Sequence, residues 1–162
     1  MDFNTDILPL KDKLFRMALR ITMQREEAED IVQEALIKLW KQRDKLADID
    51  NLEAYAITVC RNLAVDKSRR TAVMFASIDG EQQTMPTPSV NPYDSIYASE
   101  SLRQITDLMA QLPEKQRLCM HLRDFEGMNY RDIATALEIT EDQVKVNIFR
   151  ARKFIKEKMV IN

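Results

Sequence analysis

The stretch YRDIATALEITEDQVKVNIFRARKF, residues 130–154, predicts two helices joined by a tight turn. Asn129 can cap the first helix, and the residues EIT at 138–140 form the turn. Thr140 and Gln143 then match the T-x-x-Q capping box that begins a second helix. The inward positions of the first helix are Ile133, Ala134 and Leu137. This combination is typical of a helix-turn-helix, although an ordinary pair of surface helices has a similar pattern.

The second helix of this pair has one apolar side and one polar, basic side. Its inward positions, at steps of four, three and four residues, are Val144, Ile148, Ala151 and Ile155. The candidates for DNA contact on the other side are Gln143, Lys145, Val146, Asn147, Arg150, Arg152 and Lys153. Asn and Gln can pair with adenine and Arg with guanine, while Val can contact a thymine methyl group. We therefore regard Gln143, Asn147 and Arg150 as the strongest candidates for contact with bases or phosphates.

A segment without helical periodicity divides the chain. Residues 71–100 contain no Lys or Arg. The prolines that interrupt any helix there are Pro86, Pro88 and Pro92. So long a structureless segment is unusual inside a compact domain, and we interpret it as a flexible linker. The sequence therefore predicts an all-α fold of two small helical domains, residues 1–70 and 101–162, the second containing the helix-turn-helix.

The first domain is predicted from a broad apolar stripe in AEDIVQEALIKLW, residues 28–40. The stripe consists of Ala28, Ile31, Val32, Ala35, Leu36, Leu39 and Trp40, so Trp40 is expected in the core. Asp50 and Glu53 resemble a capping box that opens a further helix over residues 51–70. The basic residues at the end of that helix are Lys67, Arg69 and Arg70. They suit either an ordinary solvated helix end or a cluster that binds phosphates.

Composition excludes several classes of protein. The net charge of the 162 residues is −2, so affinity for nucleic acid must come from local patches. Cys60 and Cys119 form no disulfide framework, which favours a reducing compartment. The single His, His121, has no metal-site spacing and is expected to be structural. No pair of a nucleophile and a base is evident in the sequence. No apolar run approaches the roughly 20 residues of a membrane span, and no signal-peptide core is present. We expect a soluble cytoplasmic protein, not an enzyme, with no cofactor, metal or small-molecule substrate.

Four segments together resemble one known family. They are EAEDIVQEALIKLW (27–40), AYAITVCRNLAVDKSRR (54–70), LPEKQRLCMHLRDFEGMNYRDIATAL (112–137) and QVKVNIFRARKFI (143–155). In this order and spacing they resemble the extracytoplasmic-function (ECF) sigma factors. The resemblance implies a bacterial alternative sigma factor that directs core RNA polymerase to specific promoters in transcription initiation. The first domain would then be region 2-like and bind the −10 element, and the second would be region 4-like and bind the −35 element.

The resemblance also assigns roles to particular residues. The helix that carries Asp30, Gln33 and Glu34 corresponds to the segment that docks on the β′ coiled coil of core RNA polymerase. The residues that match the −10-binding segment are Arg61, Asn62, Asp66, Lys67, Arg69 and Arg70. Cations and polar groups of this kind can capture a single strand and a flipped base. The family further implies contact with the polymerase β flap and an anti-sigma factor, commonly tethered to the membrane.

Some positions depart from the family pattern. Glu138 stands where the family often has Gly, and a left-handed backbone there would cost roughly 1–2 kcal/mol. Val146 and Asn147 replace the more usual Ser and Arg, so the −35 sequence is left open. The alternative function is a one-component helix-turn-helix regulator, although that class needs a ligand pocket or a dimerisation helix. A helical adaptor that binds only protein would not need the cations of residues 150–153.

Overall fold

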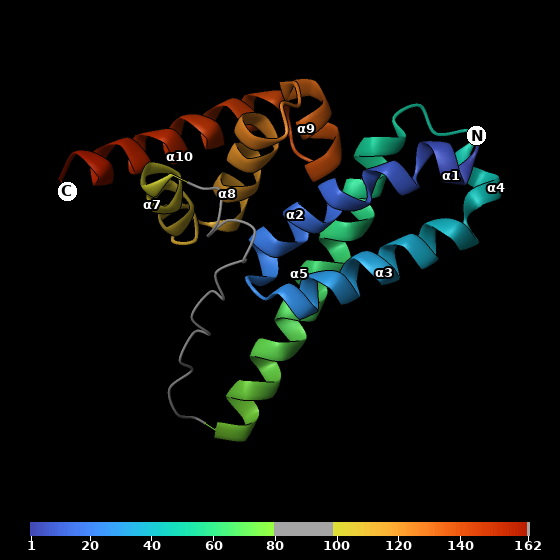
Figure 1. Cartoon of the computed structure of the whole chain (residues 1–162), viewed down its shortest axis with the longest axis horizontal. Coiled ribbons are helices and arrows are strands. Elements are labelled where there is room, and N and C mark those ends of the chain that lie inside the picture. Colours follow the sequence, from blue (N-terminus) through green and yellow to red (C-terminus); the bar gives the residue numbers. More distant parts are fainter. Residues whose placement is uncertain (80–98, 162) are drawn as a thin grey trace. The chain divides into compact units, whose positions relative to one another are not determined.

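The computed structural model describes residues 1–79 and 99–161, except for the side chains of 71–79 and 160–161. All regular structure in these ranges is helical, which confirms the predicted all-α fold (Figure 1). The chain forms two compact units, Met1–Ser89 and Val90–Asn162. Each unit has its own set of packed helices and is described separately below.

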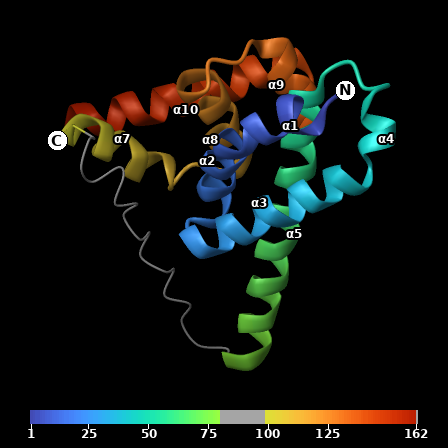
Figure 2. The same cartoon turned by 45° about the vertical axis from the view of Figure 1, so that its right-hand side comes forward.

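The first unit is built around three long helices. Its elements are α1 (Phe3–Asp6), η1 (Leu8–Leu10), α2 (Lys11–Thr22), α3 (Arg25–Lys41), α4 (Arg43–Leu46) and α5 (Leu52–Asp79). Helix α2 packs against both α3 and α5, and α3 also packs against α5 (Figure 2). The largest fully buried side chains of these three helices are Leu14, Met17, Ile31, Leu39 and Ile57. Most of the apolar stripe predicted for residues 28–40 is therefore core.

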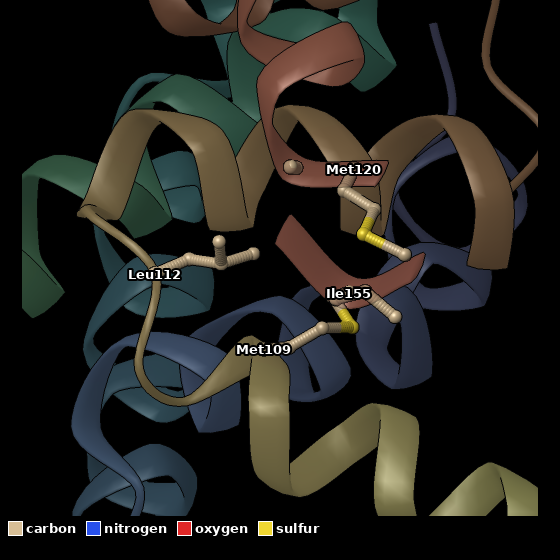
Figure 3. Close-up of a cluster of buried hydrophobic side chains, with 5 residues drawn as sticks. Met109, Leu112, Met120 and Ile155 are labelled. Atoms are coloured by element: carbon tan, nitrogen blue, oxygen red, sulfur yellow. The ribbon is translucent and has the colours of Figure 1, made fainter. Parts of the chain in front are cut away.

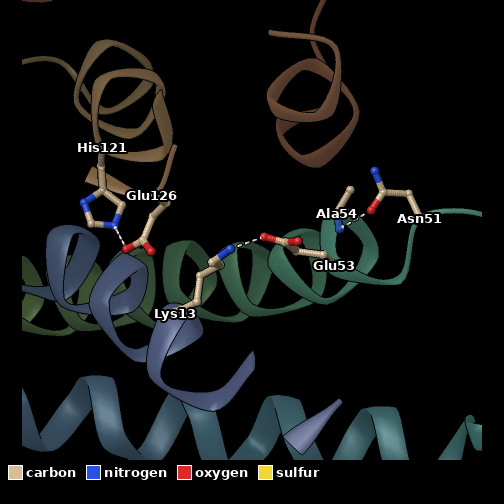
Figure 4. Close-up of polar contacts among 6 residues, drawn as sticks. All are labelled: Lys13, Asn51, Glu53, Ala54, His121 and Glu126. Carbon is tan, nitrogen blue, oxygen red and sulfur yellow. Dashed lines mark hydrogen bonds and ion pairs between the residues drawn. The ribbon is translucent and has the colours of Figure 1, made fainter. Parts of the chain in front are cut away.

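Helix α5 differs from the prediction at both ends. Its cap is Asn51, whose Oδ1 accepts a hydrogen bond from the Ala54 backbone N–H at 3.0 Å (Figure 4), so the prediction of Asp50 as the cap is wrong. Glu53 does not close a capping box but forms an ion pair with Lys13 of α2. At the other end the helix continues to Asp79, because residues 71–79 contain no Gly or Pro to stop it. The predicted linker therefore begins as helix, and its residues 80–98 lie outside the described ranges.

The second unit is organised around its C-terminal helix. Its elements are α7 (Glu100–Met109), α8 (Glu114–Met120), the π-helical turn η2 (His121–Phe125), α9 (Tyr130–Leu137) and α10 (Glu141–Ile161). Helix α10 packs against α7, α8 and α9. One core cluster consists of Met109, Leu112, Met120, Ala151 and Ile155 (Figure 3). The chain leaves η2 through Gly127, whose φ of 71° suits a residue without a side chain. This packing fixes the buried side of α10 and leaves its other side exposed.

Candidate nucleic-acid and polymerase interfaces

The turn between α9 and α10 has the geometry of a helix-turn-helix. Asn129 Oδ1 accepts from the Asp132 backbone N–H at 2.8 Å and caps α9, as predicted. The capping box of α10 is reciprocal: Gln143 N–H donates to Thr140 Oγ1 at 3.1 Å, and Thr140 N–H donates to Gln143 Oε1 at 2.9 Å. Glu138 lies in the left-handed region, with φ 58° and ψ 44°. The capping box and the left-handed backbone of Glu138 therefore determine where α10 begins and in which direction it leaves the turn.

The outward side of α10 is partly apolar. Val144, Ile148, Ala151 and Ile155 are buried as predicted. Phe149 is 67% exposed and Val146 is 45% exposed. Helical spacing sets these two side chains one turn apart and beside Arg150 and Lys153. Phe149 is not among the predicted DNA contacts, although its position next to the buried Ile148 places it away from the core.

Two of the candidate base readers make contacts within α10. Gln143 uses its side-chain oxygen in the capping box. Asn147 Nδ2 donates to the Gln143 backbone carbonyl at 2.8 Å. Both side chains are held at the N-terminal end of α10, where they are restrained before any ligand binds. Each keeps unused hydrogen-bonding capacity, because an amide has two donors and two acceptor lone pairs.

Two cations of α10 lie against the rest of the second unit. Arg152 donates from Nε to Asp124 Oδ2 at 3.0 Å, and its Nη2 forms a second, close contact with Oδ1. The hydrogen bond to Asp124 raises the pKa of Arg152 above its usual range. Lys145 Nζ lies 5.9 Å from the ring centroid of Tyr130. Among the described residues, the side chains of Arg150 and Lys153 have no ion-pair partner. The four cations among the predicted DNA contacts of α10 therefore form two groups: Lys145 and Arg152 contact other helices of the unit, and Arg150 and Lys153 do not form ion pairs within its described part.

The candidate −10 residues lie in the middle of α5. Asn62, Asp66, Arg69 and Arg70 are exposed, and helical spacing sets them along one side. Arg61 is half-buried, and its Nη1 donates to Asn62 Oδ1 at 3.3 Å. Lys67 instead turns toward α3, where its Nζ lies 3.7 Å from Asp30 Oδ2. Asn62, Asp66, Arg69 and Arg70 thus form one exposed surface, with Arg61 at its margin. Lys67 lies beside Asp30, a candidate polymerase contact.

Helix α3 exposes the three predicted docking residues, and two apolar side chains extend them. Asp30, Gln33 and Glu34 are all exposed. Ile37 is 55% exposed and Trp40 is 47% exposed. Ile37 is not among the predicted docking residues, because these were chosen for polarity and an exposed apolar residue has no such signal. The exposed side of α3 is therefore a mixed acidic and apolar surface.

The expectation that Trp40 is a core residue is wrong. Its indole packs edge-on against Phe3, with ring centroids 5.1 Å apart. The guanidinium carbon of Arg43 lies 4.0 Å from the Trp40 ring centroid, and Arg43 Nη1 also donates to the Trp40 carbonyl at 3.0 Å. A cation–aromatic contact of this kind stabilises a large ring that remains partly exposed to solvent. Trp40 therefore lies at the edge of the apolar stripe, partly open to solvent.

The two cysteines and the single histidine of the chain are buried. Burial raises the pKa of the Cys60 thiol to about 12 and that of Cys119 to about 11, so both thiols are unreactive. His121 Nε2 lies 3.1 Å from Glu126 Oε2 (Figure 4), and its ring stacks on Phe125 with centroids 5.7 Å apart. Over residues 1–79 and 99–161 no group of three His, Cys, Asp or Glu could hold a metal ion. In the same ranges no helix has the length and apolarity to cross a membrane.

Comparison with known proteins identifies both units. Residues 7–73 match the family model of Sigma-70 region 2, and residues 102–155 match that of Sigma-70, region 4. The sigma factor RpoE from Bartonella quintana, solved in complex with the anti-sigma factor NepR, is similar with a TM-score of 0.84 and 25% identity. That match covers 99% of this chain and 98% of RpoE. CnrH, solved with the cytosolic domain of CnrY, shares the fold with a TM-score of 0.68 and 18% identity, over 99% of this chain and 88% of CnrH.

Two relatives establish the family. The chain is 31% identical to the ECF RNA polymerase sigma factor SigL of Mycobacterium tuberculosis, over 88% of this chain and 80% of SigL. It is 30% identical to the RNA polymerase sigma-H factor of Pseudomonas aeruginosa, over 94% of this chain and 83% of that protein. The chain therefore belongs to the ECF RNA polymerase sigma factors, and it is an alternative sigma factor that directs RNA polymerase to promoters.

Proposed function

We propose that the two units divide promoter recognition between them. The first unit binds core RNA polymerase through α3 and the −10 element through α5, and the second unit binds the −35 element through α10. The observation that carries this proposal is that each of these helices buries one side in its unit and exposes a second side with its own chemistry. The exposed side is acidic and apolar on α3, polar and basic on α5, and basic with two apolar residues on α10.

Helix α3 supplies the polymerase contact. Asp30, Gln33 and Glu34 give it polar contacts, and Ile37 and Trp40 give it apolar anchors. Interfaces commonly derive most of their binding energy from a few such anchors, while the surrounding polar groups set register and selectivity. The partner surface is the β′ coiled coil, where basic and apolar residues would complement this face.

Helix α5 supplies the −10 contact. Arg69 and Arg70 are exposed cations that can neutralise phosphates, and Asn62 and Asp66 on the same side can bind base edges. Arg61 and Lys67 stand at the margins of this surface, Lys67 beside Asp30. Recognition of a flipped base needs this combination, because cations hold the strand by its phosphates while polar side chains contact the exposed base edge.

Helix α10 supplies the −35 contact. Arg150 and Lys153 are available for guanine or phosphate, and Gln143 and Asn147 flank them on the side toward the N-terminus of the helix. Val146 and Phe149 add an apolar strip of the kind that contacts thymine methyl groups. Contact of the second unit with the β flap would hold this helix at the distance of the −35 element.

An anti-sigma factor is a further partner. RpoE, which shares this fold, was solved in complex with the anti-sigma factor NepR, and CnrH was solved with the cytosolic domain of CnrY. The mixed surface of α3 is a surface that such a partner would cover to prevent polymerase binding. The protein acts in the cytoplasm, where polymerase and promoters are, and it acts by binding rather than by catalysis.

Run-off transcription tests the proposal. Core RNA polymerase with and without the chain is supplied with a library of templates that carry randomised −35 and −10 elements. We expect the chain to select templates with two conserved elements at a fixed spacing. Transcripts that start without sequence preference, or at the level of core polymerase alone, would refute the proposal.

A further inference from the structure

The cations of α10 do not all face the same way. Lys145 and Arg152 are two turns apart and so lie on one flank of the helix, whereas Arg150 and Lys153 lie on the outward side. The flank of Lys145 and Arg152 is the side on which η2 and α9 supply Asp124 and Tyr130. The four cations therefore differ in what they can reach.

Arg152 is held by a fork of two bonds. Its Nε and Nη2 both donate to the carboxylate of Asp124, 28 residues earlier in the chain. Two parallel charge-assisted bonds restrict both side chains to one geometry, unlike a single Lys–carboxylate contact. The pair therefore joins the middle of α10 to the π-helical turn η2.

The neighbouring ring strengthens this connection. Tyr130, the first residue of α9, has the guanidinium carbon of Arg123 at 4.9 Å and Lys145 Nζ at 5.9 Å from its ring centroid. Arg123 Nη1 also donates to the Met128 carbonyl at 2.9 Å. Cations from η2 and from α10 thus share one ring at the start of the helix-turn-helix.

We infer that Arg152 is a positioning residue that sets the orientation of α10 through Asp124, and that it does not bind a phosphate or base. To contact a phosphate, Arg152 would have to give up its bidentate bonds to the Asp124 carboxylate. Lys153 beside it has no carboxylate partner among the described residues. This inference rests on the proposed role of α10 in binding the −35 element. It removes Arg152 from the candidate DNA contacts and gives Asp124 a function in promoter recognition.

The test compares Arg152→Met with Lys153→Met, two adjacent substitutions that each remove one positive charge. Holoenzyme with each full-length chain is titrated against a duplex selected by the wild-type holoenzyme and against the same duplex with a scrambled −35 element, over a range of salt. We expect Lys153→Met to weaken binding to both duplexes alike. It should also reduce the slope of log affinity against log salt concentration by about 0.9. Arg152→Met should leave the slope unchanged and lower the ratio of selected to scrambled affinity on the order of tenfold. A slope reduced by Arg152→Met as much as by Lys153→Met would overturn the inference.

A charge swap gives the second readout. Asp124→Arg combined with Arg152→Asp removes the cation from α10 but restores the pair, so we expect it to recover most of the selectivity that Arg152→Asp alone loses. If the double variant is no more selective for the −35 element than Arg152→Asp, Arg152 acts on DNA and the inference fails. Should the wild type itself show no −35 preference, the proposed function fails, but the salt slopes still decide whether Arg152 binds phosphate.

Discussion

Lys67 Nζ lies 3.7 Å from Asp30 Oδ2, so one ion pair joins a candidate −10 contact on α5 to a candidate polymerase contact on α3. The Lys67 and Asp30 side chains are 33% and 64% exposed, and a pair this exposed contributes about 0–1 kcal/mol. If polymerase engages Asp30, the pair with Lys67 weakens and competes less with a phosphate for the Lys67 ammonium group. Docking and DNA binding would then be coupled, and the coupling could reach about fivefold at most.

The first prediction follows from this pair. Asp30→Asn should raise the affinity of the free protein for a single-stranded oligonucleotide with the −10 sequence by about two- to fivefold, because it removes an ion pair that competes with phosphate for Lys67. Glu34→Gln is the matched control, since it removes one charge from the same helix while it leaves the ion pair between Lys67 and Asp30 in place. Fluorescence anisotropy measures both. An equal gain in both variants would mean that net charge, and not the ion pair, is responsible.

The second prediction separates the two units. Glu34→Arg and Ile37→Asp should each weaken binding to core polymerase, because both side chains are exposed on α3. Arg150→Ala should leave that affinity unchanged and weaken −35 binding by about 1–3 kcal/mol if Arg150 contacts a base bidentately. Pull-down of core polymerase and −35 duplex binding are measured for all three variants. Identical losses in both assays would contradict the division of roles.

The third prediction concerns Phe149. Its side chain is 67% exposed, so Phe149→Ala should leave the free energy of unfolding nearly unchanged while it weakens −35 binding. If the ring contacts a thymine methyl group, replacing that thymine by uracil should weaken the wild type but not Phe149→Ala. Duplex binding by holoenzyme, with each thymine of the selected −35 element replaced in turn, checks this. Additive losses at every thymine would exclude a methyl contact by Phe149.

Local signals predicted the helix-turn-helix well, and long-range contacts account for what was missed. Asn129, Thr140 and Gln143 act within a few residues of themselves, so their capping roles can be read from sequence. The partner of Arg152 lies 28 residues away, and no spacing rule pairs the two. Trp40 fits a helical apolar stripe, but Phe3 and Arg43 supply enough contact at its edge for it to remain half exposed.

The fourth prediction uses the strained turn. Glu138 has φ 58°, where a side chain costs roughly 1–2 kcal/mol relative to right-handed backbone. Glu138→Gly removes that strain and increases the entropy of the unfolded chain, so a net stabilisation of about 0.5–1 kcal/mol is expected. Thermal unfolding of the full chain measures it. Glu138→Ala is the control, because it keeps the Cβ and should give no such gain.

The last prediction concerns the chain without polymerase. Its net charge is −2, and the exposed cations proposed to contact DNA are divided between α5 in one unit and α10 in the other, so each unit can neutralise few phosphates alone. Binding of the free chain to a promoter duplex should therefore lie near the non-specific range of roughly 10⁻⁴–10⁻⁶ M at physiological salt. Core polymerase would bind both units and make the second DNA contact intramolecular, with a gain of about 10²–10⁴-fold. Fluorescence anisotropy with and without core polymerase measures the difference. Nanomolar, sequence-specific binding by the free chain would instead favour action as a one-component regulator, because such a protein needs no polymerase to occupy its site.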